Sequence, residues 1–553
     1  MPSIFSLRSF YKIIDLDEGT IWIFRIVASL LCACFYFAAT AKLVGAMQQS
    51  GYSSGKFFKW LKQERNTYLT RLLFLSVLAV SSTALVIFVF SFLQEYVALA
   101  LGAIPFFGFT VIFYLADRKH ALKVEAVKSG RWVRLAIVYF FLIAIVAFAM
   151  IYLCSLLYPV LSSLFIWLRS IRFLPLCFMP LLLPCILALA NLITAPFEKA
   201  RNRKFVKRAG QVLNETNVIR IGIVGSYGKT SVKNILKELL STRFNVVATP
   251  ASYNTPMGVA KTVLKTDFTG VDVFVVEMGA RNEGDISELC TLVRPDYIIF
   301  TGVCAQHVQT FGSLEGVFKA KCEALSSGAK LIVCGASLRE DVQREYPNEA
   351  EKCLFVSDVK DLCLRADGTS FTLPLGEGDM AVETCLLGEA AAENILLAAT
   401  LAEKLGLSAE NIVSGVAALK PIEHRLQLTQ ENGVYILDDA YNCNEKGAKI
   451  AIDALKRFSG KKYVVTPGIV EAGVLHTQIN GKLGGMLAEA QLDGVILVGE
   501  TQAKVIVEGY KSAGGDDSCL QLVPSLDKAV ELLKGKLVAG DCVLFMNDLP
   551  DVV

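Results

Sequence analysis

Five long apolar runs crowd the first 195 residues of the chain and limit its folding more than any other feature. Each approaches the roughly 20 residues that an α-helix needs to cross a bilayer. The runs cover residues 24–45, 72–93, 96–115, 135–158 and 174–195. Buried helices of a large soluble core are the alternative, but so many runs in so short a stretch argue against it. We therefore expect residues 1–195 to form an α-helical transmembrane bundle of about five spans, with four or six as the alternatives.

Lys and Arg side chains gather in three segments that flank these runs, at 46–71, 116–134 and 196–208. With five spans, all three segments lie on one side of the bilayer, and an excess of Lys and Arg marks the cytoplasmic side. We therefore predict a multi-pass protein of the cytoplasmic membrane, with its N-terminus outside and its catalytic domains in the cytoplasm. The first 20 residues lack a small-residue cleavage site after an apolar core, so no cleaved signal peptide is expected.

The overall composition averages over two different halves. The chain is 53% hydrophobic and 19% charged, whereas soluble proteins are about 45–50% apolar and about 25% charged. Its net charge of +3 is too close to balance to imply a nucleic-acid partner. The fifteen cysteines follow no C-x-x-C or zinc-finger spacing, so we expect reduced thiols in a cytosolic domain.

The residues after 217 read as soluble α/β sequence and open with a phosphate-binding pattern. A β-branched run, Val218–Val224, leads into Gly225-Ser226-Tyr227-Gly228-Lys229-Thr230-Ser231 and then into a helical pattern. In such a unit the loop N–H groups surround phosphate oxygens, and the helix N-terminus adds positive potential. We expect Lys229 to reach the β- and γ-phosphates of a nucleotide and Thr230 to offer its hydroxyl to Mg²⁺. Ile223 stands at the usual first glycine, so the loop has the shorter G-x-x-G-K-T form; a chance match is the alternative.

Two further residues follow predicted strands. The apolar strand Val271–Val276 ends at Glu277, and a carboxylate at that end of a strand suits a Mg²⁺ ligand, a helix cap being the alternative. His307 follows the predicted strand Tyr297–Gly302, where a histidine is commonly structural. Each of these patterns is weak evidence alone, and it is their order along the chain that is specific.

Taken in order, these pieces resemble the Mur ligase family of ATP-dependent amide-forming enzymes, and within it the MurF type, over about residues 196–553. The matching motifs are Gly225–Ser231, Ser252–Gly258, Glu277–Ala280, His307 with Phe311–Ser313, Lys321 with Glu323, Asn394, His424–Leu426 and Asp438–Asn442. Ala390 and Ala391 stand where the family carries His and Asn. The soluble UDP-sugar-binding domain of the MurF type is not visible, and the predicted membrane domain stands in its place.

The resemblance implies roles for the residues that match. Gly225–Ser231 would bind ATP, Thr230 and Glu277 would hold one Mg²⁺, and His307 would hold a second. Asn254 corresponds to the residue that contacts the γ-phosphate.

Further along, Lys321 corresponds to a lysine that the family often carries as a carbamate, a surface helix lysine being the alternative. Asn394 corresponds to the adenine contact. Arg425 and Asp439 correspond to residues with which the C-terminal domain closes over the nucleotide.

The predicted fold is therefore multi-domain. An α-helical transmembrane bundle (1–195) and a basic juxtamembrane linker (196–217) precede an α/β P-loop ATPase domain (218–418) and a Rossmann-like α/β domain (419–553). In the last domain we expect strands at Tyr435–Leu437, Tyr463–Thr466, Val495–Val498 and Cys542–Met546.

The function that the resemblance implies is ATP-dependent ligation of a carboxylate to an amine through an acyl phosphate, in peptidoglycan precursor synthesis, with D-alanyl-D-alanine addition as in the MurF type. One alternative is a membrane-associated relative that amidates or extends a lipid-linked precursor or a γ-linked polymer. The other is an inactive membrane-anchored nucleotide-binding scaffold. The expected partners are a small-molecule or lipid-linked cell-wall precursor, an amino acid or dipeptide, and membrane lipids.

Overall fold

The structure is a computed structural model, and it falls into two compact units. It describes residues 18–63, 68–89, 127–164, 178–304, 313–376, 378–441, 443–470, 475–500 and 502–546, with single positions at 104, 108, 111, 112, 115 and 311. One unit, here the helical unit, comprises residues 1–201 with 551–553, and the other, the α/β unit, comprises residues 202–550.

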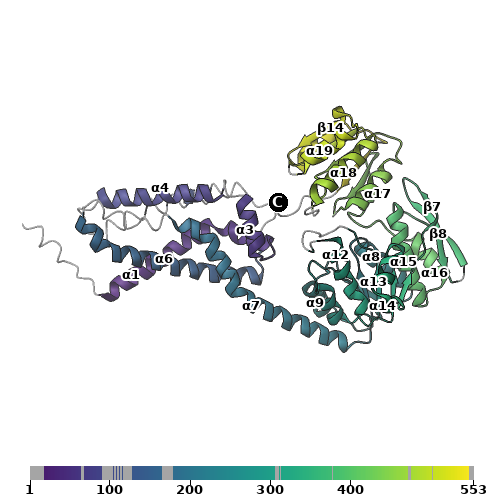
Figure 1. Cartoon of the computed structure of the whole chain (residues 1–553), viewed down its shortest axis with the longest axis horizontal. Coiled ribbons are helices and arrows are strands. Elements are labelled where there is room, and N and C mark those ends of the chain that lie inside the picture. Colours follow the sequence, from purple (N-terminus) through teal and green to yellow (C-terminus); the bar gives the residue numbers. More distant parts are fainter. Residues whose placement is uncertain are drawn as a thin grey trace, which may run out of the picture. The chain divides into compact units, whose positions relative to one another are not determined.

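The described part of the helical unit is made of helices, four of them long and two short (Figure 1). They are α1 (Glu18–Ala39), α2 (Ala41–Gln49), α3 (Ser54–Gln63), α4 (Tyr68–Val89), α6 (Gly130–Leu164) and α7 (Met179–Asn214). Their buried faces form one apolar core that includes Leu43, Tyr139 and Leu183. Within that core the Thr40 hydroxyl lies 3.0 Å from the Tyr139 hydroxyl, so the break between α1 and α2 is tied to α6.

Two of the described helices are long and apolar enough to cross a membrane, namely Gly130–Leu153 of α6 and the helix α7. A third span results if Arg25–Ala39 and α2, which are bent by 52° at their break, count as one. These helices contain the predicted first and fourth runs and most of the fifth, whose residues 174–177 lie outside the described part of the chain. The described part of the second run, 72–89, falls in α4, where the apolar stretch Thr70–Ala79 is shorter than a span. Most of the third run, 96–115, lies outside the described residues.

Helix α7 is longer than the fifth apolar run, because it continues without a break to Asn214. Most of the segment 196–217, predicted as a linker, is therefore helical. Its basic side chains are exposed, whereas Ala209 and Leu213 near its end are buried in the core of the α/β unit. The sequence composition indicated polar flanking residues here but did not show that they continue the helix.

The α/β unit begins with a sheet of six parallel strands in the spatial order β2-β3-β1-β4-β5-β6. The strands are β1 (Ile219–Val224), β2 (Val246–Ala248), β3 (Val273–Glu277), β4 (Tyr297–Phe300), β5 (Leu331–Cys334) and β6 (Cys353–Phe355). Side chains alternate along them, so that Ile221 and Ile223 face one core and Val224 the other. Both faces are covered by helices, as expected of a parallel sheet.

Different helices cover the two faces of this sheet. On one face pack α8 (Lys229–Leu240), α15 (Glu389–Lys404) and α16 (Ala409–Ala417). On the other pack the end of α7 with α9 (Pro256–Lys265), α10 (Asp285–Val293) and α12 (Leu314–Cys322). A small antiparallel sheet, β7 (Lys360–Leu364), β8 (Thr369–Leu375) and β9 (Gly378–Thr384), joins the first face. No sequence pattern predicted this small sheet.

The last part of the α/β unit is a second six-stranded sheet, ordered β10-β11-β15-β12-β13-β14. The pair β10 (Gln427–Glu431) and β11 (Val434–Asp439) is antiparallel, and the other neighbours are parallel. The other strands are β12 (Lys462–Thr466), β13 (Gly494–Val498), β14 (Leu520–Val523) and β15 (Cys542–Met546). The four strands predicted here are confirmed.

Helices also cover both faces of the second sheet. The helices α17 (Glu445–Leu455), α18 (His476–Glu489) and α19 (Ala503–Ser512) cover one face, and α20 (Leu526–Lys534) covers the other.

Candidate active site

The backbone of the glycine loop between β1 and α8 lies so close to neighbouring residues that it leaves no room for larger side chains. Gly225 has φ +148° and Gly228 has φ +73°, conformations that glycine adopts without strain. A Cβ on Gly225 would collide with the Thr301 hydroxyl, and one on Gly228 would lie 2.5 Å from Asn394 Oδ1. The loop therefore needs both glycines, and its backbone is left open to a ligand.

Two polar side chains of this loop bear on phosphate binding. Lys229 Nζ donates to the carbonyl oxygens of Gly225 (2.8 Å) and Ser226 (3.2 Å), and its burial lowers its pKa. The Ser226 hydroxyl is buried and has no hydrogen-bond partner among the described residues. A buried polar group of this kind normally has a partner, which a phosphate oxygen would supply.

The Glu277 carboxylate is the centre of the site. It ends β3, which pairs with β1 so that Glu277 lies beside Ile223, just before the loop. Its Oε2 accepts from the Thr230 hydroxyl at 2.9 Å, and its Oε1 accepts from Asn254 Nδ2 at 3.0 Å. The Lys233 ammonium lies 3.5 Å from Oε2. Parallel strands bring these residues from distant segments to one edge of the sheet.

The Thr230 and Glu277 oxygens fit a Mg²⁺ ion. Mg²⁺ takes oxygen ligands in an octahedron at about 2.0–2.1 Å, which puts neighbouring ligand oxygens about 3 Å apart. Thr230 Oγ1 and Glu277 Oε2 are 2.9 Å apart and both residues line the same cavity. His307, the predicted ligand of a second Mg²⁺, lies outside the described residues.

Most of the predicted phosphate and metal residues, together with Lys321, line one cavity of about 430 Å³. Its lining includes Ser226–Thr230, Asn254, Glu277, Lys321, Arg425 and Tyr441. Lys321, at the end of α12, is only 2% exposed, and its Nζ lies 3.5 Å from the carbonyl oxygen of Ala280. Burial, with the charge of Lys229 adding to it, lowers the pKa of Lys321 to about 7. This lysine is therefore not the surface helix lysine that was the alternative; its neighbour Lys319 is exposed and pairs with Glu315.

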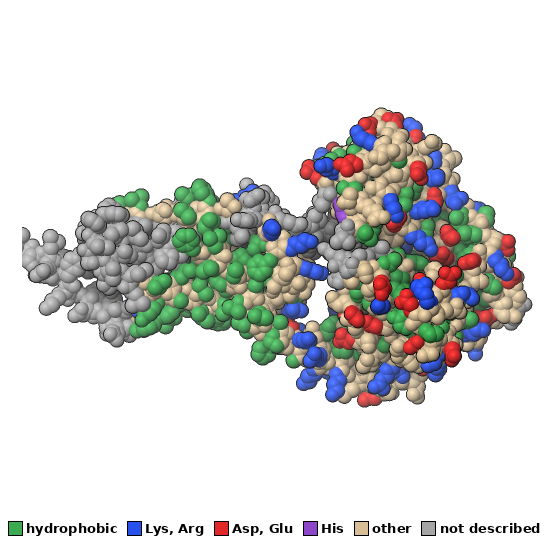
Figure 2. Space-filling view, viewed as in Figure 1, with side chains coloured by type: hydrophobic (Ala, Val, Ile, Leu, Met, Phe, Trp, Pro, Cys, Tyr) green, Lys and Arg blue, Asp and Glu red, His purple; other side chains and the backbone are tan. Residues whose placement is uncertain are grey.

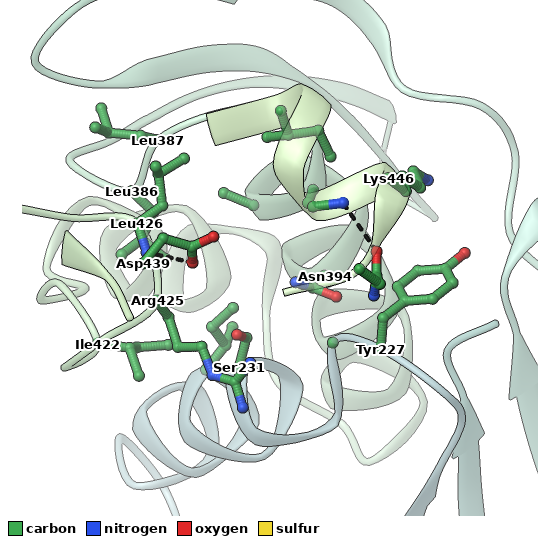
Figure 3. Close-up of a pocket in the computed structure, with 17 residues that line it drawn as sticks. Tyr227, Ser231, Leu386, Leu387, Asn394, Ile422, Arg425, Leu426, Asp439 and Lys446 are labelled. Atoms are coloured by element: carbon green, nitrogen blue, oxygen red, sulfur yellow. Dashed lines mark hydrogen bonds between the residues drawn. The ribbon is translucent and has the colours of Figure 1, made fainter. Parts of the chain in front are cut away.

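A smaller cavity of about 140 Å³ adjoins the glycine loop (Figure 3). The predicted nucleotide residues Tyr227, Gly228, Ser231, Asn394, Arg425 and Asp439 line it, together with apolar residues that include Leu386, Ala391 and Ile450. Asp439 Oδ1 accepts from the backbone N–H of Leu426 at 3.1 Å, and burial raises the pKa of Asp439 to about 7. The apolar lining suits a planar heterocycle and the polar groups suit its edge.

Two contacts at this site were not predicted. Lys233 follows Lys229 by one helical turn, which puts both on the same face of α8, and its pairing with Glu277 depends on the fold. Lys446 Nζ lies 3.0 Å from both Glu393 carboxylate oxygens and 5.1 Å from the centre of the Tyr227 ring. No local pattern links Lys446 to Glu393, which is 53 residues away.

Models of known protein families match both domains of the α/β unit. The Mur ligase middle domain matches residues 223–402, and the Mur ligase glutamate ligase domain matches residues 424–548.

Curated relatives and a solved structure point the same way. The chain is 27% identical over 344 residues to the UDP-N-acetylmuramoyl-tripeptide–D-alanyl-D-alanine ligase of Bacillus subtilis, covering 60% of this chain and 74% of that one. It is 30% identical over 339 residues to the ligase of the same name from Synechocystis sp., covering 59% and 70%. The crystal structure of MurF ligase from Thermotoga maritima in complex with ADP superposes with a TM-score of 0.57 at 26% identity, covering 64% and 81%.

Proposed function

Because the chain belongs to the Mur ligase family of ATP-dependent ligases, we propose that it joins a carboxylate to an amine through an acyl phosphate. The observation that carries the proposal is the convergence of Lys229, Thr230, Asn254, Glu277 and Lys321 on one cavity. A nucleotide-binding scaffold needs only the contacts to the nucleotide. A buried lysine with a lowered pKa, Lys321, and a carboxylate held by three side chains, Glu277, are typical of a catalytic site.

In the first step a carboxylate oxygen attacks the γ-phosphorus, an O–P bond forms, and the bond to the ADP oxygen breaks. The obstacle is the approach of an anion to an anion, so positive groups must screen the charge and align the atoms. The loop N–H groups and Lys229 would hold the β- and γ-phosphates, and Asn254 would contact the γ-phosphate. Thr230 and Glu277 would hold Mg²⁺, which neutralises phosphate charge when bound.

In the second step an amine nitrogen attacks the acyl carbon, the C–O bond to phosphate breaks, and the nitrogen loses a proton. Water competes with the amine for the acyl phosphate, so the site must exclude water. Arg425 and Asp439 come from the second sheet's domain and would close over the nucleotide, with Asn394 at the adenine. A second Mg²⁺ held by His307 and a carbamate on Lys321 complete the proposed site.

The substrates that we favour are those named for the relatives, a UDP-N-acetylmuramoyl-tripeptide and D-alanyl-D-alanine. The second candidate is a lipid-linked carboxylate precursor. One observation favours it, since the described residues include two helices, Gly130–Leu153 and Met179–Asn214, that are long and apolar enough to span a membrane. We place the protein in the cytoplasmic membrane with its ligase domains in the cytoplasm.

The test is ATP hydrolysis by the full chain with soluble and with lipid-linked precursor, each with and without D-alanyl-D-alanine. We expect ADP formation that depends on the precursor, and a product larger by the mass of the dipeptide. Lys229→Ala should abolish this turnover, whereas Lys319→Ala, on the exposed face of α12, should retain it. Turnover independent of any precursor, or equal in Lys229→Ala, would refute the ligase.

A further inference from the structure

A cluster of charged and aromatic side chains lies at one end of the helical unit, outside the ligase site. We call it the boundary cluster, and it consists of Tyr52, Arg131, Trp132, Arg134, Glu198 and Arg201. It forms where α6 begins, where the apolar part of α7 ends, and where the turn between α2 and α3 meets both. Asn191 Nδ2 donates to the carbonyl oxygen of Tyr52 at 2.9 Å, and Arg131 Cζ lies 3.7 Å from the centre of the Tyr52 ring.

The cluster has an excess of positive charge. Glu198 is 3% exposed and accepts from Arg134 Nε at 2.5 Å and from Arg201 Nη2 at 2.8 Å. The charge of Arg131 also acts on this carboxylate. Three guanidinium groups thus face one carboxylate, which leaves two positive charges uncompensated within the cluster. A structural ion pair would need only one of them.

The cluster also contains buried hydrogen-bond donors without a partner in the described part of the chain. Tyr52 Oη, Trp132 Nε1 and Arg134 Nη2 are buried and have no partner among the residues that the structure describes. Asn191, whose Nδ2 donates to the Tyr52 carbonyl oxygen, has in Oδ1 a buried acceptor without a partner among the same residues. A buried donor without a partner costs free energy, so each of these three donors would gain from an acceptor that reaches it.

The chemistry that satisfies both features is an anionic group with several oxygens. A phosphate accepts from three or more donors at once and pairs well with guanidinium groups. The Asn191 acceptor suits a hydroxyl next to that phosphate, such as those of glycerol.

The surroundings indicate where this phosphate comes from. On α7, Leu192 is 69% and Phe197 is 74% exposed, and the exposed basic residues of the helix follow directly. Figure 2 shows hydrophobic side chains over most of the described surface of this unit, with Lys and Arg side chains gathered at one end of it. In a membrane protein, the surface changes from apolar to basic at the depth where the lipid headgroups lie. We propose that the boundary cluster binds the phosphate of an anionic lipid headgroup.

The proposal rests on the proposed membrane association and not on the ligase chemistry. The experiment is native mass spectrometry of the full chain in detergent, equilibrated with equal amounts of phosphatidylglycerol and phosphatidylcholine. We expect phosphatidylglycerol to be retained in preference by roughly tenfold. Inorganic phosphate in large excess should not displace it, because the acyl chains also contribute; displacement would assign the site to free phosphate. A protein that enters the aqueous phase without detergent would refute the membrane association itself.

Matched variants separate a site from general surface charge. Arg131→Gln with Arg134→Gln should abolish the preference, whereas Lys204→Gln with Lys207→Gln, which removes the same charge from the exposed part of α7, should retain it. Tyr52→Phe keeps the ring under Arg131 and removes one donor. It should weaken retention roughly threefold without lowering the melting temperature. Equal losses in both double variants, or an unchanged preference in Tyr52→Phe, would overturn the proposal.

Discussion

Lys233 Nζ lies 3.5 Å from Glu277 Oε2, and both side chains are only 2% exposed. The pair joins the first helix after the glycine loop to the end of the neighbouring strand. The same carboxylate also accepts from Thr230 and Asn254, so it is held from three directions. Lys233 therefore fixes the carboxylate that is proposed to hold Mg²⁺.

Replacing Lys233 by Met should lower the free energy of unfolding by about 3–5 kcal/mol, because it leaves a buried carboxylate without its cation. Adding Glu277→Gln should restore part of the loss, since the unpaired charge is then removed as well. Hydrogen exchange of peptides from α8 and β3 in the full chain measures both effects. The control is Lys237→Met, one turn further along α8 and half-buried. Equal costs at 233 and 237 would mean that the ion pair does not stabilise the fold.

Replacing Gly228 by Ala should weaken ATP binding by at least about tenfold, which is ~1.4 kcal/mol. The new Cβ would lie 2.5 Å from Asn394 Oδ1 and displace the proposed adenine contact. Gly499 is a matched control, because its φ of +79° is similar but a Cβ there meets nothing within 4 Å. Gly499→Ala should therefore show only the strain of the left-handed backbone, about 1–2 kcal/mol in stability, with normal affinity. Calorimetric titration with a non-hydrolysable ATP analogue compares the two.

The sequence sufficed where a local pattern dictates the geometry. The run Val218–Val224 followed by Gly-x-x-Gly-Lys-Thr is strand β1, the glycine loop and helix α8. Glu277 was placed because an apolar strand ends there, and parallel pairing brings that end beside the loop. The spacing of Lys321 from the other family motifs predicted its place in the site. Its burial could not be predicted, because it depends on the fold.

What the sequence could not give depends on contacts between distant segments. Lys446 meets Glu393 only because α17 and α15 come together, and neither residue stands out in its own helix. The basic stretch after residue 196 read as a linker, since charge marks a membrane boundary but does not end a helix. The boundary cluster could not be predicted either, because its residues Tyr52 and Arg131 are far apart in sequence.

The half-buried Asp439 should make stability fall as the pH rises from about 4 to about 7. Its pKa is raised from 3.8 to about 7 by burial, so the folded state keeps a proton that the unfolded state has lost in this window. The stabilisation is complete below the unfolded pKa and is lost as the pH passes the folded pKa. Asp439→Asn should remove this slope, which is at most about 1.4 kcal/mol per pH unit. Scanning calorimetry of the full chain from pH 4 to 8 measures it, with the exposed Asp453→Asn as the control.

The lowered pKa of Lys321 predicts the opposite slope and a chemical reactivity. Its pKa falls from 10.5 to about 7, so between these values the folded state binds fewer protons and stability rises with pH. Lys321→Met should remove that rise.

Carbamate formation needs the neutral amine, whose nitrogen attacks CO₂ and releases a proton. An ordinary lysine is neutral in only about one molecule in a thousand at pH 7.5, whereas Lys321 is mostly neutral there. With ¹³C-bicarbonate we therefore expect a carbamate signal in NMR spectra that grows from pH 6 to 8, disappears in Lys321→Ala and persists in Lys319→Ala. A signal that Lys321→Ala retains would assign the carbamate elsewhere, and no signal at pH 8 would leave Lys321 a neutral amine in the resting enzyme.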